Sequence, residues 1–314
     1  MPSQSAAGKA FEYALINEAN RILSPKLNVI LVQDDTYKNA EKSFSLFSNS
    51  IRTSYITAAN AALSHILSLE PKLHYEISDR DILQLQLASD SSGQVGDVRD
   101  ILFIRSWKDW EIGISAKNNH MAVKHSRLSK TKNFGEDWVG VSCSQNYFNL
   151  ISPIFDHLQH LKESNAKWSS VKNKKHNIYV PILNAFRDEL LRINENNPHV
   201  PEKLVSYLLG RNDFYKVIRR AKRVEIYGFN INGNLNRSIH DKSLREVQKL
   251  KLPTEIIQFE YRPDSDTTLL LVCNEGWQIS FRIHSAESMV IPSLKFDTNL
   301  IGQPPSLYSH HITY

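Results

Sequence analysis

The chain has 314 residues and a mass of 36.0 kDa, and 41% of its residues are hydrophobic and 23% charged. A chain of this length and hydrophobic content can form one large domain or two smaller ones. The same values exclude a disordered tail and a disulfide miniprotein. The formal net charge of +5 and the pI near 9.0 point to a polyanionic partner if the positive charge is clustered.

The cysteines and the lengths of the apolar runs indicate the cellular compartment in which the protein is expected. Cys143 and Cys273 lie far apart without a CxxC partner, so neither a cysteine zinc site nor a disulfide framework is indicated. No apolar run approaches the ~18 residues that span a bilayer, and the N-terminal residues lack the basic and apolar regions of a signal peptide. We therefore expect a cytoplasmic protein without a membrane partner.

The first half of the sequence predicts helices followed by strands. Apolar residues recur at helical spacing over residues 8–22 and over the longer stretch 39–69, which we interpret as one scaffold helix. The period then changes to two, and strands are predicted at 82–87, 101–104 and 110–117. The last two form an antiparallel hairpin. A short strand is predicted at 138–143 and a helix at 148–161.

The second half predicts helices and then strands. Residues 167–177 are basic and polar, which is typical of an exposed linker. Two helices are predicted, at 181–193 and 201–218, and residues 255–297 alternate strand patterns with turn signals. No internal repeat is present. The order of elements predicts a mixed α/β fold with a β-rich C-terminal region.

The predicted hairpin carries the side chains of chemical interest. If it turns around Trp107 and Lys108, paired residue numbers sum to about 215, so Asp100 lies opposite Ser115. Lys117 shares the face of Ser115, because side chains alternate along a strand. A carboxylate beside a lysine suits metal-assisted phosphodiester hydrolysis, in which oxygen ligands hold Mg²⁺ and the lysine orients the attacking water. Taken alone, this pattern favours an ordinary polar strand end with a surface lysine.

A charge pattern of one sign follows the hairpin. Between Ile112 and Gly135 no residue is acidic, while positive charge comes from Lys117, His120, Lys124, His125, Arg127, Lys130 and Lys132. A solvated basic face usually includes acids, whereas a nucleic-acid site needs uncompensated cations to neutralise phosphates. A second acid-free run, which we expect to grip a nucleic-acid backbone or groove, contains Lys216, Arg219, Arg220, Lys222 and Arg223.

Six segments resemble the HaeIII-type type II restriction endonucleases of the PD-(D/E)XK nuclease superfamily. They are GDVRDI (96–101), WEIGISAKNNHMAVKHSRLSKT (110–131), FGEDW (134–138), CSQNY (143–147), YVPILNAF (179–186) and LLGRNDFYKVI (208–218). The resemblance runs from the first helix to about residue 220. It implies a PD-(D/E)XK catalytic core, a mixed sheet flanked by helices, in residues 1–165. Residues 166–314 would form a helical and β-rich region for DNA recognition or an accessory role.

The resemblance also implies an activity and its partners. The expected protein is a cytoplasmic bacterial enzyme that cuts double-stranded DNA at the palindrome GGCC with Mg²⁺, beside a methyltransferase that protects the host. The metal-binding Asp of the superfamily falls on Asp100, with Asp97 as the less favoured choice, and the catalytic Lys on Lys117. The backbone carbonyl of Ala116 is a further expected metal ligand.

This sequence has no acid at the position where the superfamily has its second metal-binding carboxylate. That position, two residues before the catalytic lysine, holds Ser115. Glu136, downstream in the basic segment, and Glu12, in the first helix, are our preferred replacements. Glu111 shares the strand face but is too far away along the strand.

DNA contacts are expected from the two basic runs. We assign phosphate contacts to His120, Lys124, His125, Arg127 and Lys130. Guanine edges in GGCC require arginine or lysine donors in the major groove. Candidates are the C-terminal β region and Arg211, Arg219, Arg220, Arg223 and Arg237.

Oligomeric state and function class stay open at this stage. A palindromic target favours a two-fold homodimer, although enzymes of short sites also act as monomers. One competing interpretation is a non-catalytic DNA-binding protein whose carboxylates are structural ion-pair partners. Another is a PD-(D/E)XK nuclease with a repair or structure-specific role.

Overall fold

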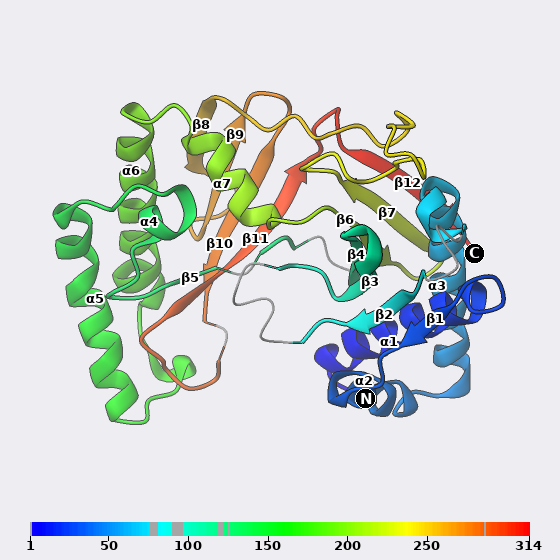
Figure 1. The fold of residues 1–314 in the computed structure, drawn as a ribbon. Helices are drawn as coiled ribbons and strands as arrows, with labels where there is room; N and C mark the ends of the chain where they lie inside the picture. The colour runs from blue at the N-terminus through cyan, green and yellow to red at the C-terminus, as the bar shows by residue number, and fades with distance from the viewer. Residues whose placement is uncertain (1, 76–80, 90–96, 119–121, 125, 286) are drawn as a thin grey trace. The chain divides into compact units, whose positions relative to one another are not determined.

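The computed structural model describes residues 2–75, 81–89, 97–118, 122–124, 126–285 and 287–314. The chain forms two compact units (Figure 1). The first unit consists of residues 1–121, 210–250 and 306–314, and the second of residues 122–209 and 251–305. These units do not divide at residue 165, where we expected the boundary, because the chain leaves the first unit and returns to it twice. Within the described residues, no helix is long and apolar enough to cross a membrane.

The first unit is a mixed sheet with helices. Its helices are α1 (Gln4–Leu23), α2 (Asp35–Ser45) and α3 (Asn49–Leu69). Its strands are β1 (Val29–Leu31), β2 (Leu83–Leu87), β3 (Ile101–Arg105), β4 (Trp110–Asn118), β6 (Phe214–Arg219), β7 (Arg223–Phe229) and β12 (Tyr308–Thr313). The strand order is β1-β2-β3-β4-β6-β7-β12, with parallel pairs β1/β2 and β4/β6 and antiparallel pairs elsewhere. The predicted mixed α/β class is confirmed.

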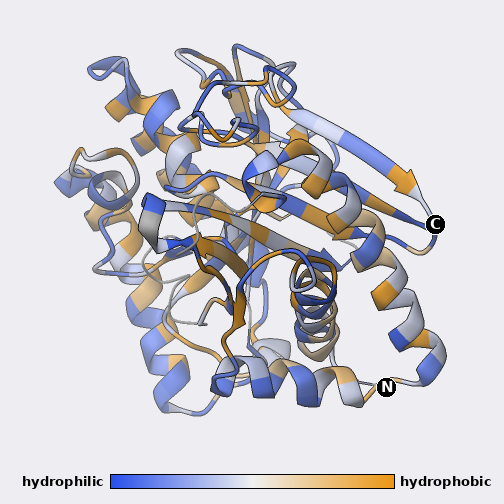
Figure 2. Cartoon of the chain, turned by 45° about the vertical axis from the view of Figure 1, so that its right-hand side comes forward, coloured by the Kyte–Doolittle hydropathy of each residue, from blue (hydrophilic) through white to orange (hydrophobic). Residues whose placement is uncertain are grey.

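The predicted hairpin and its register are confirmed. Ile101 pairs with Ile114 and Arg105 with Trp110, so the paired numbers sum to 215. A short turn over Ser106–Lys108 connects the strands, and Asp109 completes it with a left-handed backbone, φ 48°. Apolar residues of β3 and β4 join those of α1 and α3 in one buried core. Figure 2 shows these helices carrying both hydrophilic and hydrophobic residues, as the amphipathic pattern predicts.

The single scaffold helix predicted at 39–69 is wrong, because it consists of α2 and α3. Ser48 precedes α3 with an extended backbone, φ −62° and ψ 157°, which no continuous helix allows. Phe44 of α2 and Phe47 of the connection both pack against Tyr55 of α3, with ring centroids 6.5 and 5.5 Å away. The apolar spacing seen in the sequence therefore reflects a shared core across a break.

The described residues of the second unit form four α-helices and a five-stranded sheet. The helices are α4 (Phe134–Val139), α5 (Gln145–Glu163), α6 (Val180–Glu195) and α7 (Val200–Leu209). The strands, in the order β5-β11-β10-β9-β8, are β5 (Arg127–Leu128), β11 (Leu294–Gly302), β10 (Gln278–His284), β9 (Thr268–Cys273) and β8 (Ile256–Tyr261). All four pairs are antiparallel, which confirms the β-rich C-terminal region.

One face of this sheet carries the core of the second unit. The ring of Phe186 on α6 lies 5.8, 5.5 and 4.9 Å from the rings of Phe259, Phe281 and Phe296. Trp138 of α4 lies 6.3 Å from Phe296. The helices therefore pack on the face formed by these three aromatic residues of β8, β10 and β11.

Three further predictions of elements are wrong, and glycines contribute to two of them. Residues 138–143 form no strand, since α4 covers Phe134–Val139 and ends at Gly140 with φ 70°. The helix predicted at 201–218 ends at Leu209, because Gly210 takes φ 97°, and β6 follows. Residues 167–177 are not a wholly exposed linker, because Trp168 is buried.

The first unit contains a buried carboxyl group. Glu70 follows α3 and is completely buried. Its Oε1 accepts hydrogen bonds from the Tyr215 hydroxyl and the Asn236 N–H, both at 2.6 Å. Burial raises the pKa of Glu70 to about 7, and the two hydrogen bonds oppose that shift. The folded protein therefore holds a proton here at pH values where the unfolded chain has lost it.

This proton makes stability depend on pH. Between pH 4.5 and 7 only the folded state keeps Glu70 protonated, so the free energy of unfolding falls as pH rises through this window. The fall attributable to Glu70 is at most about 3 kcal/mol. Glu70→Gln keeps the acceptor oxygen without a charge, so we expect it to remove most of this fall. Denaturant unfolding at pH 5 and pH 8 measures it, with exposed Glu195→Gln as control, and parallel profiles for wild type and Glu70→Gln would contradict it.

Candidate active site

Asp100 and the end of β4 form the centre of the site. The backbone of Asp100 is held on both sides, because its N–H donates to Ile114 O at 2.8 Å and its carbonyl accepts from Ala88 N at 2.9 Å. Its Oδ2 accepts from Ala116 N at 2.7 Å and from Lys117 Nζ at 3.1 Å. The hydroxyl of Ser115 lies 3.3 Å from the same oxygen. The structure thus brings together the aspartate and lysine that the sequence pairs.

The site is open to a ligand. Asp100 and Lys117 each keep 23% of their side chains exposed. In the described part of the chain, Asp100 Oδ1 accepts no hydrogen bond. Ile114 O and Ala116 N both point towards β3, so the Ala116 carbonyl does too, beyond the point where β3 begins. Asp100 Oδ1 and the Ala116 carbonyl therefore fit the oxygen-ligand chemistry of Mg²⁺.

These ligands do not form a complete protein cage. The described residues contain no group of three or more His, Cys, Asp and Glu side chains arranged to hold a metal. Mg²⁺ is commonly bound by one or two carboxylates together with water and substrate phosphates. The donor set fits an ion held jointly with substrate.

The carboxylate of Asp97 forms an ion pair with Arg99. The guanidinium donates to both carboxylate oxygens, with Nη2 at 2.7 Å from Oδ2, and also lies 2.7 Å from Glu111. Burial raises the pKa of Asp97, but the hydrogen bonds from Arg99 outweigh it and leave the pKa below its usual value. Asp97 and Glu111 are thus ion-pair partners of one buried arginine, which supports Asp100 as the metal-binding acid.

The stem of Arg99 also explains a glycine in β4. A Cβ on Gly113 would lie 2.3 Å from Arg99 Cδ, closer than any real contact. Gly113 shares the strand face of Ser115 and Lys117. The side chain of Arg99 therefore lies against β4 beside Ser115 and Lys117, and only glycine leaves room for it.

Lys216 is a site residue whose place the sequence reasoning missed. We placed it in a helix and in a surface patch, but it lies on β6, is 2% exposed and pairs in register with Ser115. Burial and, to a smaller extent, the charge of Lys117 together lower its pKa to about 7, against the opposing effect of Asp100. The run FYKVI (214–218) after Gly210 predicts a buried strand, and this is the signal that could have placed Lys216 in the interior.

Glu12 lies on α1 with its carboxylate 3.9 Å from Lys9 Nζ. The core residues of α1 belong to the same cluster as Ile112, Ile114 and Ala116 of β4. Ser115 and Lys117 point to the other face, because side chains alternate. Glu12 therefore belongs to the helix that packs on the face opposite these two side chains.

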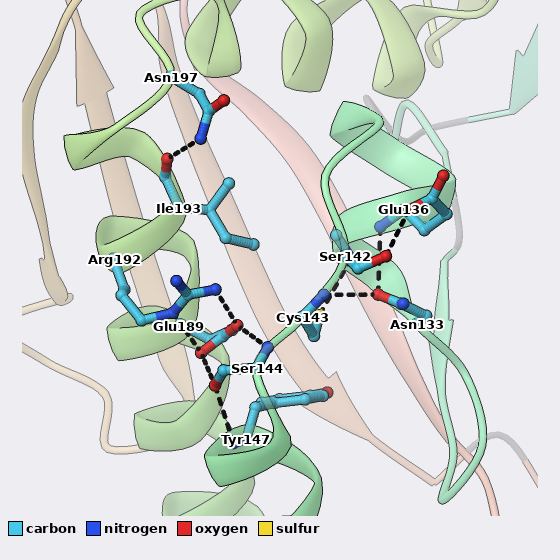
Figure 3. Close-up of polar contacts among 11 residues, drawn as sticks. Asn133, Glu136, Ser142, Cys143, Ser144, Tyr147, Glu189, Arg192, Ile193 and Asn197 are labelled. Carbon is cyan, nitrogen blue, oxygen red and sulfur yellow. Dashed lines mark hydrogen bonds and ion pairs between the residues drawn. The ribbon is translucent and has the colours of Figure 1, made fainter.

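Glu136 belongs to the second unit. It lies on α4, where Ser142 Oγ donates to its carboxylate at 2.6 Å and its own N–H donates to Asn133 Oδ1 at 3.2 Å (Figure 3). Its side chain is exposed. Its role as the second metal-binding acid stays a prediction.

Basic side chains of the segment after β4 have interaction partners in the fold. His120 and His125 lie outside the described residues. Lys124 Nζ lies 3.5 Å from the centroid of the Tyr207 ring, and Lys130 forms an ion pair with Asp156 at 2.7 Å. Acids distant in sequence thus compensate charges that look uncompensated locally.

The second basic run is likewise paired. Arg219 donates to Asn118 and Ser54, with Cζ 4.6 Å from the centroid of the Tyr55 ring. Arg220 and Arg223 both bind Glu225, and Arg237 donates to backbone carbonyls of Gly233 and Asp241. The side chain of Arg211 is exposed and makes no hydrogen bond or ion pair with the residues that the structure describes.

These features together suit one type of chemistry. A fixed carboxylate with an open oxygen, a neighbouring carbonyl and a lysine at an accessible strand end are the protein parts needed for metal-assisted hydrolysis of a phosphodiester.

Comparison with known proteins agrees with this chemistry. The HaeIII restriction endonuclease family matches residues 8–304. The type II restriction enzyme HaeIII of Haemophilus aegyptius is 41% identical over 304 residues, which cover 96% of this chain and 95% of that protein. The similarity thus extends beyond residue 220, where the motifs seen in the sequence end. The chain belongs to the HaeIII restriction endonuclease family.

Proposed function

We propose that the protein is a type II restriction endonuclease that hydrolyses double-stranded DNA at GGCC with Mg²⁺. The observation that carries this proposal is the convergence of Ala116 N, Ser115 Oγ and Lys117 Nζ on Asp100 Oδ2 in a chain of this family. The name of the relative from Haemophilus aegyptius supports the restriction activity. The site specificity rests on the resemblance alone.

Each residue has a distinct task. Asp100 and the Ala116 carbonyl would hold Mg²⁺, and Glu12 or Glu136 would supply a second carboxylate. When bound, the ion supplies charge stabilisation at the phosphoryl oxygen and the leaving 3′ oxygen. Lys117 orients the attacking water and neutralises developing charge. Ser115 helps to hold the Asp100 carboxylate in place.

Partners and DNA contacts follow from the same proposal. Exposed Arg211 is the best-placed candidate for a contact with DNA, whereas Arg219, Arg220 and Arg223 would contact it with N–H donors that their present partners do not use. His120, Lys124, His125, Arg127 and Lys130 stay proposed phosphate contacts. We further propose a cytoplasmic enzyme in a bacterium whose methyltransferase protects GGCC, and a homodimer on the palindrome.

Digestion of unmethylated plasmid tests the proposal. We expect discrete fragments only with Mg²⁺, and sequencing should place every fragment end within GGCC. Methylated plasmid and the Lys117→Ala protein are the controls. Salt-sensitive binding without cleavage under any divalent metal would favour the non-catalytic DNA-binding protein. Cleavage of flaps or junctions without sequence preference would favour a structure-specific nuclease.

A further inference from the structure

The sheet of the second unit has a second face. Phe259, Phe281 and Phe296 point towards the helices, so the residues that alternate with them point the other way. On this face lie Arg127, His284, Arg282, Lys295, Asp297 and Asn299. It is therefore a polar surface on an antiparallel sheet.

Basic side chains form one row across this face. Lys295 on β11 pairs in register with Arg127 on β5 and with His284 on β10. Directly opposed side chains of neighbouring strands lie close together, and like charges in such a pair are destabilising. Arg127 and Lys295 are such a pair.

Lys295 has no direct polar partner among the described residues that would offset this repulsion. Its ammonium makes no hydrogen bond or ion pair there. Burial and Arg127 lower its pKa, and Asp297 and Glu287 only partly oppose them. A side chain that loses water without gaining a partner destabilises the fold.

Arg127 is anchored but still accessible. Its Nη1 donates to Ser293 Oγ at 3.0 Å, and its Nη2 lies 3.9 Å from Glu287. The side chain is 40% exposed. A guanidinium has five N–H donors, so donors stay available for a ligand beside Lys295.

The neighbouring row shows that the excess of positive charge is local. Two residues along the strands, Asp297 pairs in register with Arg282, so opposite charges face each other. The same face thus holds one row of opposite charges and one row in which basic side chains are compensated only by the 3.9 Å contact of Arg127 with Glu287. A row with an excess of positive charge fits a ligand that brings negative charge.

We propose that the row of Arg127, Lys295 and His284 binds the phosphate backbone of duplex DNA. The proposal rests on the proposed function, which makes duplex DNA the partner. Neighbouring strands are about 4.8 Å apart, so the row spans about 10 Å, which suits one or two phosphates of a DNA strand. A bound phosphate replaces the repulsion between Arg127 and Lys295 with a shared attraction. Phosphate contacts position DNA without reading its sequence.

Lys295→Gln tests the proposal by binding rather than by cleavage. Duplexes with and without GGCC are titrated with Ca²⁺ in place of Mg²⁺, at several salt concentrations. We expect affinity for both duplexes to fall about three- to tenfold at 0.1 M salt, and the slope of log K against log salt to fall by about one. Without DNA, the melting temperature should rise by about 1 to 3 °C, because the repulsion is gone.

Two variants control the measurement. Lys295→Arg should keep the affinity and the salt slope, and Lys172→Gln, at an exposed lysine of the same unit, should change neither. An unchanged affinity with a raised melting temperature would overturn the proposal, because the row would then affect only the fold. A loss confined to the GGCC duplex would also overturn it, since it would indicate base reading. Failure of the wild type to bind any duplex would instead reject the proposed function.

Discussion

Asp100→Asn is expected to reduce DNA cleavage by about 10³-fold or more. The amide keeps an oxygen that accepts from Ala116 N and Ser115 Oγ, so the local structure should persist. It removes the charge that would hold Mg²⁺ and that faces Lys117 at 3.1 Å. Single-turnover cleavage of a GGCC duplex gives the rate, and calorimetric titration of Ca²⁺ into the protein–DNA complex should show weaker metal binding.

The control for this variant is exposed Asp264→Asn, in the turn between β8 and β9. Wild-type cleavage by Asp100→Asn would remove Asp100 from the site. Full Ca²⁺ affinity with lost cleavage would assign it a role other than metal binding. The same titration with Glu12→Gln and Glu136→Gln identifies the second carboxylate, since only the true ligand should weaken Ca²⁺ binding.

Lys117→Ala should lose cleavage to a similar extent and keep most of its affinity for DNA. The ammonium lies at the accessible end of β4 against Asp100. Its proposed role there is to orient water and to neutralise charge during the reaction. One lysine contributes only one of many phosphate contacts, so binding in Ca²⁺ should fall severalfold at most. Cleavage rate and binding are measured on the same duplex, with exposed Lys26→Ala as control.

A variant of Lys216, the second lysine near Asp100, tests whether the role belongs to Lys117. Lys216 lies beside Ser115 on the next strand but is almost completely buried. If Lys117→Ala cleaves at the wild-type rate while Lys216→Met does not, the role assigned to Lys117 belongs to Lys216. Equal losses in both would indicate that the two act as one charged unit.

The sequence predicts the hairpin well because its determinants are local. Alternation, a short turn and the numbering of paired residues suffice to place Asp100 opposite Ser115, and the structure has that register. The amphipathic helices α1, α5 and α6 follow from spacing for the same reason.

The sequence predicts the long-range parts of the site poorly. β6 adjoins β4 in space, but the chain reaches it only after the helices of the second unit, and the apolar run of β6 also fits a helix. The charge pattern fails similarly for Lys130, because its acid partner Asp156 lies 26 residues further along the chain. Glu225, the partner of Arg220 and Arg223, lies just beyond the end of the acid-free run. The role of Arg99 between Asp97 and Glu111 appears only in three dimensions.

The interleaving of the two units has a consequence for synthesis. β4 carries Ser115 and Lys117, but its parallel neighbour begins at Phe214, about 100 residues later, or roughly 5 to 20 s at ribosomal speed. β12 joins β7 only after residues 251–305 have also been made. A nascent chain therefore displays Asp100 and Lys117 long before the sheet that holds them is complete. A chain truncated in the second unit would carry these residues without a formed nuclease site.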